Sequence, residues 1–403
     1  MMMKNFLYGC MAAMLLSTGS CGKETTAPAG DPLVTSPDDS TKVPEVSMYL
    51  KSARETNNFI VANLLTPYKS YKVNTTTNTT SAFEWYTVSQ IYADAAMVVN
   101  GDASYLTSMN QTFEWMEHLW DKNDPNGGYF GFASLDGSGA SGIKYVDDNS
   151  LSGMVYLEAY EVSTGSYKEA YLSKAKRCAD WLIKSGLYDQ THGGGFWWTT
   201  DRQVKPTQTN GLALQLFSKL YKITGEKVYL DWAVLVNTWL NTKMYDANTG
   251  LYAWQFEENG LRNNVFFTYD NAIMVEAFLL YAQATNDKVY VAKAQEIGKA
   301  MNRVLWDTQH NVYIFNTADR RVTPAWCGWG TQAMIKLYEQ DKNASWLSYA
   351  KGNVDAINTI LLNPANKGYL QFANLDGSGK YSNYEGVDQA WMQRLQVMLS
   401  KYK

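Results

Sequence analysis

Residues 189–198 read Asp-Gln-Thr-His-Gly-Gly-Gly-Phe-Trp-Trp, a polar, glycine-rich turn that leads into a short aromatic run. Units of the same kind recur at steps of 56 to 68 residues, opening at Asp121, Asp246, Asp307 and Asn363. Self-similarity at such a period is typical of a repeat architecture, in which each unit buries its apolar face against its neighbours. Between the turns, apolar residues follow helical spacing, as at Leu212, Leu216 and Leu220.

A helix with a polar start is expected after each aromatic turn. The five starts are Asp147-Asp148-Asn149, Gln208-Thr209-Asn210, Tyr269-Asp270-Asn271, Gly330-Thr331-Gln332 and Val387-Asp388-Gln389. Asn149, Asn210, Asn271 and Gln332 lie 61 residues apart. We therefore predict an all-α fold, an (α/α)6 barrel (toroid) of six helical hairpins with short aromatic β-turn segments at the rim. Ring closure buries both ends of the repeat without special caps.

Composition limits the function further. The 403 residues carry a formal net charge of -4 and no run of basic residues, which argues against nucleic-acid binding. Hydrophobic residues make up 46% of the chain, enough for a large core, and aromatic residues 14%. The three histidines are scattered, so we expect no metal site, no cofactor and no histidine-based hydrolytic triad. The aromatic rings either fill the core or line a cleft that stacks the flat faces of sugars.

The N-terminus resembles a bacterial lipoprotein signal. Residues 1–20 hold Lys4 and an apolar stretch too short to span a bilayer, and Cys21 follows Gly19 and Ser20. We expect residues 1–20 to be a signal peptide, Cys21 to be lipidated, and residues 21–44, rich in Pro, Thr and Ser, to be a flexible linker. The catalytic domain then covers residues 45–403. An ordinary secretory signal with an incidental cysteine is the alternative.

These features predict a monomer in the bacterial cell envelope, held at the outer membrane by its lipid anchor. After processing, Cys178 and Cys327 are the cysteines left, so at most one disulfide can form.

Asp147 and Asp148 are the candidate catalytic residues. Cleavage of a glycosidic bond needs two carboxyl groups beside it, one as proton donor and one as nucleophile or base. Adjacent residues at a helix start can both face one cleft, and their mutual repulsion keeps one of them protonated to higher pH. The alternative is helix capping, since Asp and Asn favour N-cap positions.

One further motif is misleading. Residues 137–142, Gly-Ser-Gly-Ala-Ser-Gly, match a dinucleotide-binding fingerprint, but no strand–helix–strand unit surrounds them. The stretch Leu135–Gly139 recurs as Leu375–Gly379, which indicates the same turn in two repeats.

Three stretches together resemble glycoside hydrolase family 76: residues 145–148 with the Asp pair, residues 193–212 with Trp197-Trp198 and Asn210-Gly211-Leu212, and residues 268–271. That family comprises endo-α-1,6-mannanases with an (α/α)6 barrel. The resemblance implies retaining hydrolysis of the α-mannan backbone of yeast-type mannan, with Asp147 as nucleophile and Asp148 as general acid/base. We expect substrate contacts from Trp197, Trp198, Lys205, Asn210, Tyr269, Asp270, Asn271, Trp326 and Asp388.

Each of these has a structural alternative, such as a core tryptophan, a solvated lysine or a capping asparagine. For the whole protein two other functions remain open: a non-catalytic glycan-binding surface lipoprotein, and another (α/α)6 carbohydrate-active enzyme such as a sugar epimerase or an unsaturated-uronide hydrolase. Sugar epimerases of this shape resemble one another in using paired histidines.

Overall fold

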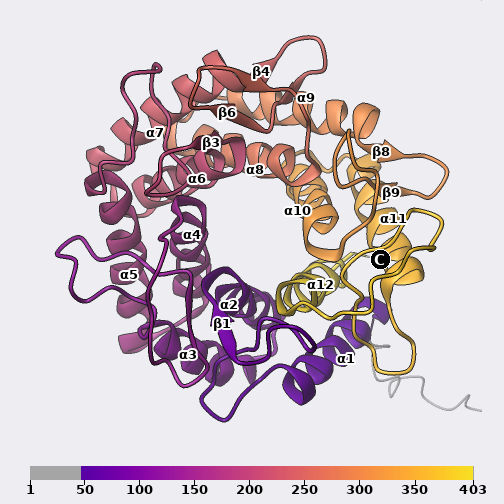
Figure 1. Cartoon of the computed structure of the whole chain (residues 1–403). Helices are drawn as coiled ribbons and strands as arrows, with labels where there is room; N and C mark the ends of the chain where they lie inside the picture. Colours follow the sequence, from indigo (N-terminus) through magenta and orange to yellow (C-terminus); the bar gives the residue numbers. More distant parts are fainter. Residues whose placement is uncertain (1–46, 403) are drawn as a thin grey trace, which may run out of the picture. The chain divides into compact units, whose positions relative to one another are not determined.

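The computed structural model describes residues 47–402, so the predicted signal peptide, Cys21 and the linker lie outside the described residues. Two concentric rings of helices form the fold (Figure 1). The inner ring consists of α2 (Glu84–Val99), α4 (Val146–Val162), α6 (Thr207–Thr224), α8 (Thr268–Thr285), α10 (Pro324–Asp341) and α12 (Gly386–Leu399). The outer ring consists of α1 (Met48–Asn63), α3 (Tyr105–Met116), α5 (Gly165–Lys184), α7 (Lys227–Trp239), α9 (Val289–Val304) and α11 (Ala344–Leu361).

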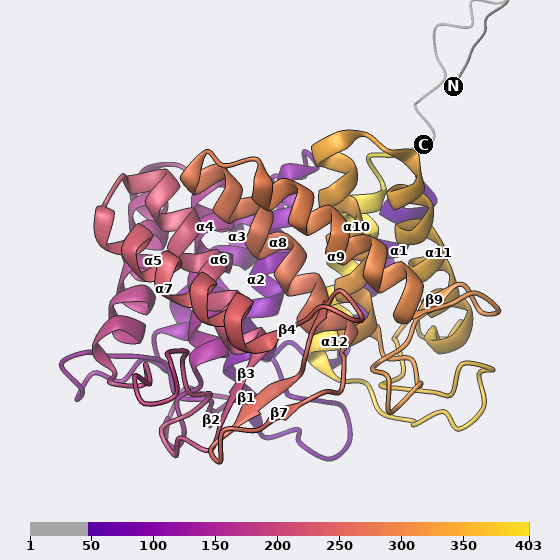
Figure 2. The same cartoon turned by 90° about the horizontal axis from the view of Figure 1, so that it is seen from above.

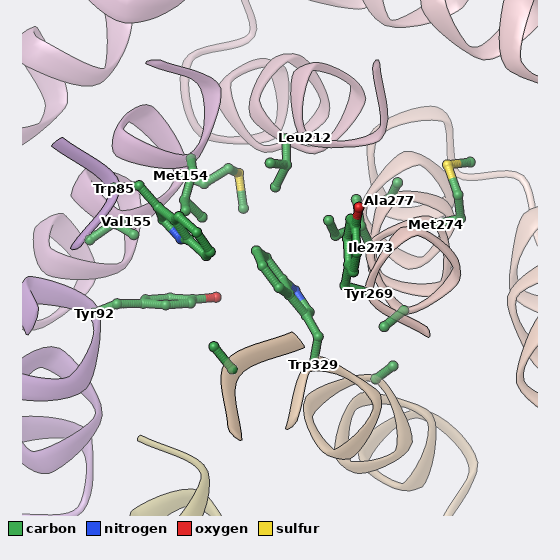
Figure 3. Packing of buried hydrophobic residues seen from close by; sticks show 14 of the residues in the cluster. Trp85, Tyr92, Met154, Val155, Leu212, Tyr269, Ile273, Met274, Ala277 and Trp329 are labelled. Atoms are coloured by element: carbon green, nitrogen blue, oxygen red, sulfur yellow. The ribbon is translucent and has the colours of Figure 1, made fainter. Parts of the chain in front are cut away.

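Burial distinguishes the two rings. Every residue of α8 from Thr268 to Leu279 is buried, because an inner helix packs against neighbours on all sides. The outer helix α9 buries one stripe only, at Ala294, Ile297, Gly298, Ala300 and Met301, and leaves its other face to solvent. Aromatic and aliphatic side chains from the inner helices, among them Trp85, Tyr92 and Trp329, point toward the middle of the ring (Figure 3). The barrel therefore has a packed interior.

The two ends of the described chain close the ring. Each inner helix contacts the next, and α12 contacts α2. Outer helices α3, α5, α7, α9 and α11 each pack on the inner helix that precedes them, whereas α1 packs on α12. The sixth hairpin is thus assembled from the first and the last helix. The predicted (α/α)6 toroid is confirmed, and no helix within residues 47–402 is both long and apolar enough to cross a membrane.

The short strands and the loops that carry them lie at one end of the barrel (Figure 2). The pairs are β1 (Ser81–Phe83) with β2 (Phe132–Ser134), β4 (Tyr245–Asp246) with β5 (Leu251–Tyr252), β8 (Trp306–Asp307) with β9 (Val312–Tyr313), and β6 (Gln255–Glu257) with both β3 (Val204–Pro206) and β7 (Arg262–Asn263). A five-residue π-helical turn, Leu240–Met244, leads from α7 into β4. In each polar turn the opening side chain accepts backbone N–H bonds, as Asp246 does from Asn248 and Thr249 at 2.9 and 3.0 Å.

The 61-residue spacing has a structural cause. Asn210 accepts a hydrogen bond from the backbone N–H of Phe196 at 2.7 Å and donates to its carbonyl oxygen at 3.1 Å. Asn149 holds Tyr129, Asn271 holds Tyr252 and Gln389 holds Tyr369 in the same way, each with an N···O distance of 2.7 Å. A side-chain amide with both a donor and an acceptor thus fixes each aromatic turn to the first turn of the following inner helix.

One predicted helix start is wrong. Helix α10 begins at Pro324, because proline suits the first helical position, so Gly330-Thr331-Gln332 lies in mid-helix. Gln332 instead donates to Glu276 at 2.9 Å and accepts from Arg394 at 2.7 Å. In this repeat the aromatic turn is held by Asn353 of α11, which accepts from the N–H of Tyr313 at 2.9 Å. Cys178 and Cys327 are free, buried thiols, so the disulfide that the sequence allowed is absent.

Candidate active site

A cavity of about 330 Å³ opens at the N-terminal ends of the inner helices, at the barrel end that carries the aromatic turns. Asp147 and Asp148, the second and third residues of α4, line it together. Its other lining residues are Phe83, Trp85, Tyr145, Leu151, Trp198, Gln208, Leu212, Tyr269, Ile273, Trp326 and Trp329. The structure thus brings two adjacent carboxyl groups into a mainly aromatic and aliphatic pocket.

Asp147 is held by a residue of the next repeat. The indole Nε1 of Trp198 donates to both of its carboxylate oxygens at 2.9 Å. The Trp198 backbone is fixed in turn, since its carbonyl oxygen accepts from the N–H of Val146 at 2.9 Å. Burial raises the pKa of Asp147 to about 6, and the bond from Trp198 limits that rise because it stabilises the ionised form. The position in the first turn of a helix also favours a negative charge.

Asp148 has a different environment. Its Oδ2 is buried and has no hydrogen-bond partner. Burial and then the charge of Asp147 raise the pKa of Asp148 well above its ordinary value. The pair therefore consists of one carboxyl whose anion is stabilised by a donor and one carboxyl that retains its proton.

A third carboxyl, that of Glu84 at the start of α2, lies close enough to interact with the pair. Ser152 donates to its Oε1 at 2.8 Å, while Oε2 is buried without a partner. Burial, followed by the charge of Asp148, raises the pKa of Glu84 well above its ordinary value. Glu84 is therefore a neutral acid beside the pair, and it is not among the residues that line the cavity.

Two other acidic residues at the third helical position serve the structure. Asp270 of α8 accepts from the N–H of Gln208 at 3.1 Å, and Asp388 of α12 accepts from the N–H of Ala325 at 2.9 Å. Each thus caps the start of the preceding inner helix. Neither lines the cavity, so the expectation of substrate contacts from Asp270 and Asp388 is not supported. Asp148 holds the equivalent position in α4 and faces the cavity instead.

The expected sugar contacts from Lys205, Asn210 and Asn271 also need correction. Lys205 is 0% exposed; its Nζ pairs with Asp189 at 2.6 Å and lies over the rings of Trp197, Trp239 and Phe256. Asn210 and Asn271 are fully buried and hold the aromatic turns. All three bond with other parts of the protein and do not line the cavity.

The aromatic candidates divide. Trp198, Tyr269 and Trp326 line the cavity, whereas Trp197 is 7% exposed and packs under the rim beneath Lys205. The Trp326 ring lies 4.5 Å from that of Trp85 and 4.6 Å from that of Tyr269, so these three rings form one wall. Gly193, Gly194 and Gly195 allow the turn below Trp198 because all three have positive φ, which side-chain-bearing residues rarely adopt.

The sequence analysis missed Trp85, Gln208, Glu84 and Phe83. Trp85 occupies in α2 the position that Asp147 occupies in α4. A step of 61 residues back from Asp147 arrives at Tyr86, next to Trp85, so the repeat could have indicated this residue. Gln208 was recognised only as part of a polar helix start, although it lines the cavity. Within the described residues no cluster of three or more His, Cys, Asp or Glu side chains could hold a metal ion.

Comparison with solved structures shows what this fold is similar to. A GH76 alpha-mannanase of Bacteroides thetaiotaomicron superimposes with a TM-score of 0.76 at 18% identity, over 88% of this chain and 96% of that one. An inactive variant of an alpha-1,6-mannanase of Salegentibacter sp. HEL1_6, with two consecutive aspartates replaced by asparagine and alpha-1,6-mannotriose bound, gives 0.71 at 17%, over 88% and 100%. The cellobiose 2-epimerase of Bacillus thermoamylovorans B4167 gives 0.71 at 13%, over 87% and 98%.

At these identities the structures show the fold alone, and a search of curated proteins gives no match. The sequence model described as Glycosyl hydrolase family 76 matches residues 52–323, which hold α4 with its Asp pair and the turn with Trp198. That match covers well over half of the chain and confirms the resemblance found in the sequence. This chain therefore belongs to glycosyl hydrolase family 76, and it is a glycoside hydrolase.

Proposed function

We propose that this protein is a retaining endo-α-1,6-mannanase that hydrolyses the α-mannan backbone of yeast-type mannan. The observation that carries the proposal is the contrast between the two adjacent carboxyls in the cavity. Asp147 accepts two hydrogen bonds from Trp198, whereas the buried Oδ2 of Asp148 accepts none. A retaining glycosidase needs this division into an ionised nucleophile and a protonated acid.

In the first step Asp148 gives its proton to the glycosidic oxygen while a carboxylate oxygen of Asp147 attacks the anomeric carbon. The bond to the leaving sugar breaks, and a covalent glycosyl ester on Asp147 forms. In the second step the Asp148 carboxylate takes a proton from water, whose oxygen attacks the same carbon. The ester bond to Asp147 breaks, Asp148 is protonated again, and the sugar leaves with its original anomeric configuration.

The walls of the cavity suit a pyranose ring. Trp85, Tyr269 and Trp326 offer flat apolar faces, and the Gln208 side chain at the same level offers an amide. The preference for an α-1,6-linked mannan draws on the titles of the related structures, which name alpha-1,6-mannanases and a bound alpha-1,6-mannotriose.

A sugar epimerase shares the fold at a TM-score of 0.71. None of the chain's three histidines lines the cavity: His192 lies beside Asp189, His310 beside Asp307 and His118 near Trp115. The cavity offers two carboxyls as its acid and base, which favours hydrolysis.

Proton NMR of a fresh digest of debranched α-1,6-mannan tests the proposal. We expect the α-anomer of the new reducing end to appear first and oligosaccharides of several lengths to accumulate. Initial appearance of the β-anomer would contradict the retaining mechanism. Binding of mannan without any new reducing ends would indicate the non-catalytic glycan-binding function instead.

For the N-terminal region we propose lipidation at Cys21 and anchoring at the outer membrane. The support is the signal-like sequence of residues 1–20 and the Pro- and Thr-rich stretch that follows. Cys21→Ala should move the protein from the membrane fraction to the soluble fraction and remove labelling by a fatty-acid probe. Membrane association that persists in this variant would contradict the anchor.

A further inference from the structure

A line of aromatic rings leads from the cavity onto the outer surface of the rim. Trp198 contacts Tyr145 at a centroid distance of 5.5 Å, Tyr145 meets Phe83 at 6.3 Å, and Phe83 stacks on Phe132 at 4.4 Å and 12°. The first three rings line the cavity, and Phe132 lies beyond it. Phe132 is 43% exposed, which is unusual for a phenylalanine.

The strand register places the last ring. Phe83 and Phe132 are direct partners in the antiparallel pair of β1 and β2, and their side chains therefore lie on the same face. Ala82 and Ala133, the next pair along, are buried on the opposite face. The ladder thus anchors its alanine face in the protein and presents its phenylalanine face at the rim.

The same loop occurs a second time in the chain and gives an internal comparison. Residues 135–139 and 375–379 are identical, and in both loops Ser donates to Asp two positions earlier, at 2.7 Å from Ser138 and 2.6 Å from Ser378. Phe372 therefore corresponds to Phe132, and Tyr381 corresponds to Ser141. Both positions pair across the loop in the same way.

In the second loop the ring is covered. Tyr381 stacks on Phe372 at 5.1 Å and 2°, and the guanidinium of Arg321 lies 5.0 Å from the centre of the Phe372 ring. In the first loop the small Ser141 takes the place of Tyr381 and leaves the Phe132 ring open. One copy of the loop is thus closed with its own side chains, while the copy next to the cavity presents a bare aromatic face.

We propose that Phe132, supported by Phe83, is a remote subsite that stacks a sugar unit of the substrate polysaccharide outside the cavity. This inference rests on the proposed function. The occupant is the substrate chain itself, because the rings are continuous with the wall beside Asp147 and a chain leaving the cavity along them reaches Phe132 next. A flat apolar ring at the edge of a polar rim is suited to the C–H face of a pyranose.

The test compares hydrolysis of α-1,6-manno-oligosaccharides of increasing length by the wild type, Phe132→Ala and Ser141→Tyr. Ser141→Tyr reproduces the covered arrangement of the second loop without removing Phe132. Tyr381→Ala is the matched control, because it changes an equally exposed ring, at 44%, in the corresponding loop. Thermal melting of each variant checks that it is folded.

We expect kcat/KM for the longest substrates to fall about 3- to 10-fold in Phe132→Ala and Ser141→Tyr, the size of one lost aromatic contact. The shortest cleaved substrate should be processed at the wild-type rate, and Tyr381→Ala should match the wild type at every length. A uniform loss at all lengths, no loss at all, or an equal loss in Tyr381→Ala would overturn the subsite while leaving the proposed function intact.

If the wild type cleaves none of these substrates, the proposed function fails, and mannan binding decides the subsite. Retardation of the wild type in a mannan-containing native gel that is weakened in Phe132→Ala and Ser141→Tyr would uphold it. Equal retardation of all variants, or none, would overturn it.

Discussion

The indole of Trp198 and the carboxylate of Asp147 form a bond across two repeats: one N–H faces both oxygens at 2.9 Å. Trp198 belongs to the aromatic turn before α6, while Asp147 belongs to the first turn of α4. The charge state of the proposed nucleophile is therefore set by the packing of one repeat on the next. This relationship gives the first prediction.

Trp198→Phe should raise the pKa of Asp147, because it removes a hydrogen bond that favours the ionised form. The acidic limb of the kcat/KM profile, set in the wild type by a group with a pKa of about 6, should then move to higher pH. The matched control is Trp197→Phe, whose indole lies beneath Lys205 and does not bond to Asp147. An unshifted acidic limb in Trp198→Phe would contradict this assignment.

Asp147→Asn and Asp148→Asn should each lower kcat/KM on α-1,6-mannan by at least about 100-fold, since each removes one of the two groups that the chemistry requires. Neither should lower the melting temperature, because an amide relieves the cost of burying a charge in the cavity. Calorimetry and reducing-sugar assays on the same samples separate the two effects. Activity close to that of the wild type in either variant would rule out the proposed mechanism.

Lys205→Met should destabilise the protein by about 3 kcal/mol, because it leaves Asp189 at 6% side-chain exposure without its cation. The KM of the folded enzyme should stay within about twofold, since Lys205 does not reach the cavity. Urea unfolding and steady-state kinetics measure the two quantities. Lys176→Met, which removes an exposed pair with Glu226, is the control and should have little effect on stability. A large rise in KM with unchanged stability would restore Lys205 as a substrate ligand.

Asp94 should make the protein less stable as pH rises. Burial raises its pKa to about 7, although Ser108 and Gln90 donate to it at 2.7 and 2.8 Å. The folded state therefore binds this proton more tightly than the unfolded chain, and the stabilisation present below about pH 4 is lost as pH rises toward 7. Asp94→Asn should reduce the decline in unfolding free energy over this range.

Asp102→Asn provides a control of opposite sign. Hydrogen bonding from Ser104 lowers the pKa of Asp102, so its contribution is lost as pH falls. Urea titrations at pH 4, 5.5 and 7 compare the three proteins. An equal decline in the wild type and Asp94→Asn would show that Asp94 does not carry this dependence.

The sequence predicted the ring of hairpins because its recurring units are local patterns: a polar turn, an aromatic strand and a polar helix start. It also identified Asp147 and Asp148, which the structure places together at the cavity. The role of Asn210 was not predictable in this way, since the same amide suits a sugar hydroxyl and a backbone clamp. The difference lies in whether Phe196, fourteen residues earlier, folds back onto it.

Lys205 and Trp85 failed to be predicted for a related reason. Lys205 is enclosed by Trp239 and Phe256 from later parts of the chain, and Trp85 faces Trp326 from the opposite part of the sequence. Such neighbours arise from closure of the ring and leave no local pattern. Gln332 kept the 61-residue spacing but lies in mid-helix, because Pro324 started α10 earlier than its repeat position suggested.

The pairing of α1 with α12 has a consequence for biosynthesis. Gln396 donates to Thr56 across 340 residues, so the last hairpin cannot assemble until the ribosome has released almost the whole chain. Until then the apolar stripe of α1 has no helix to cover it, and the nascent protein depends on its neighbours or on chaperones to avoid aggregation. A circular permutant with its ends between α5 and α6, which makes α12 and α1 consecutive, turns this contact into a local one. It should refold faster than the natural chain order.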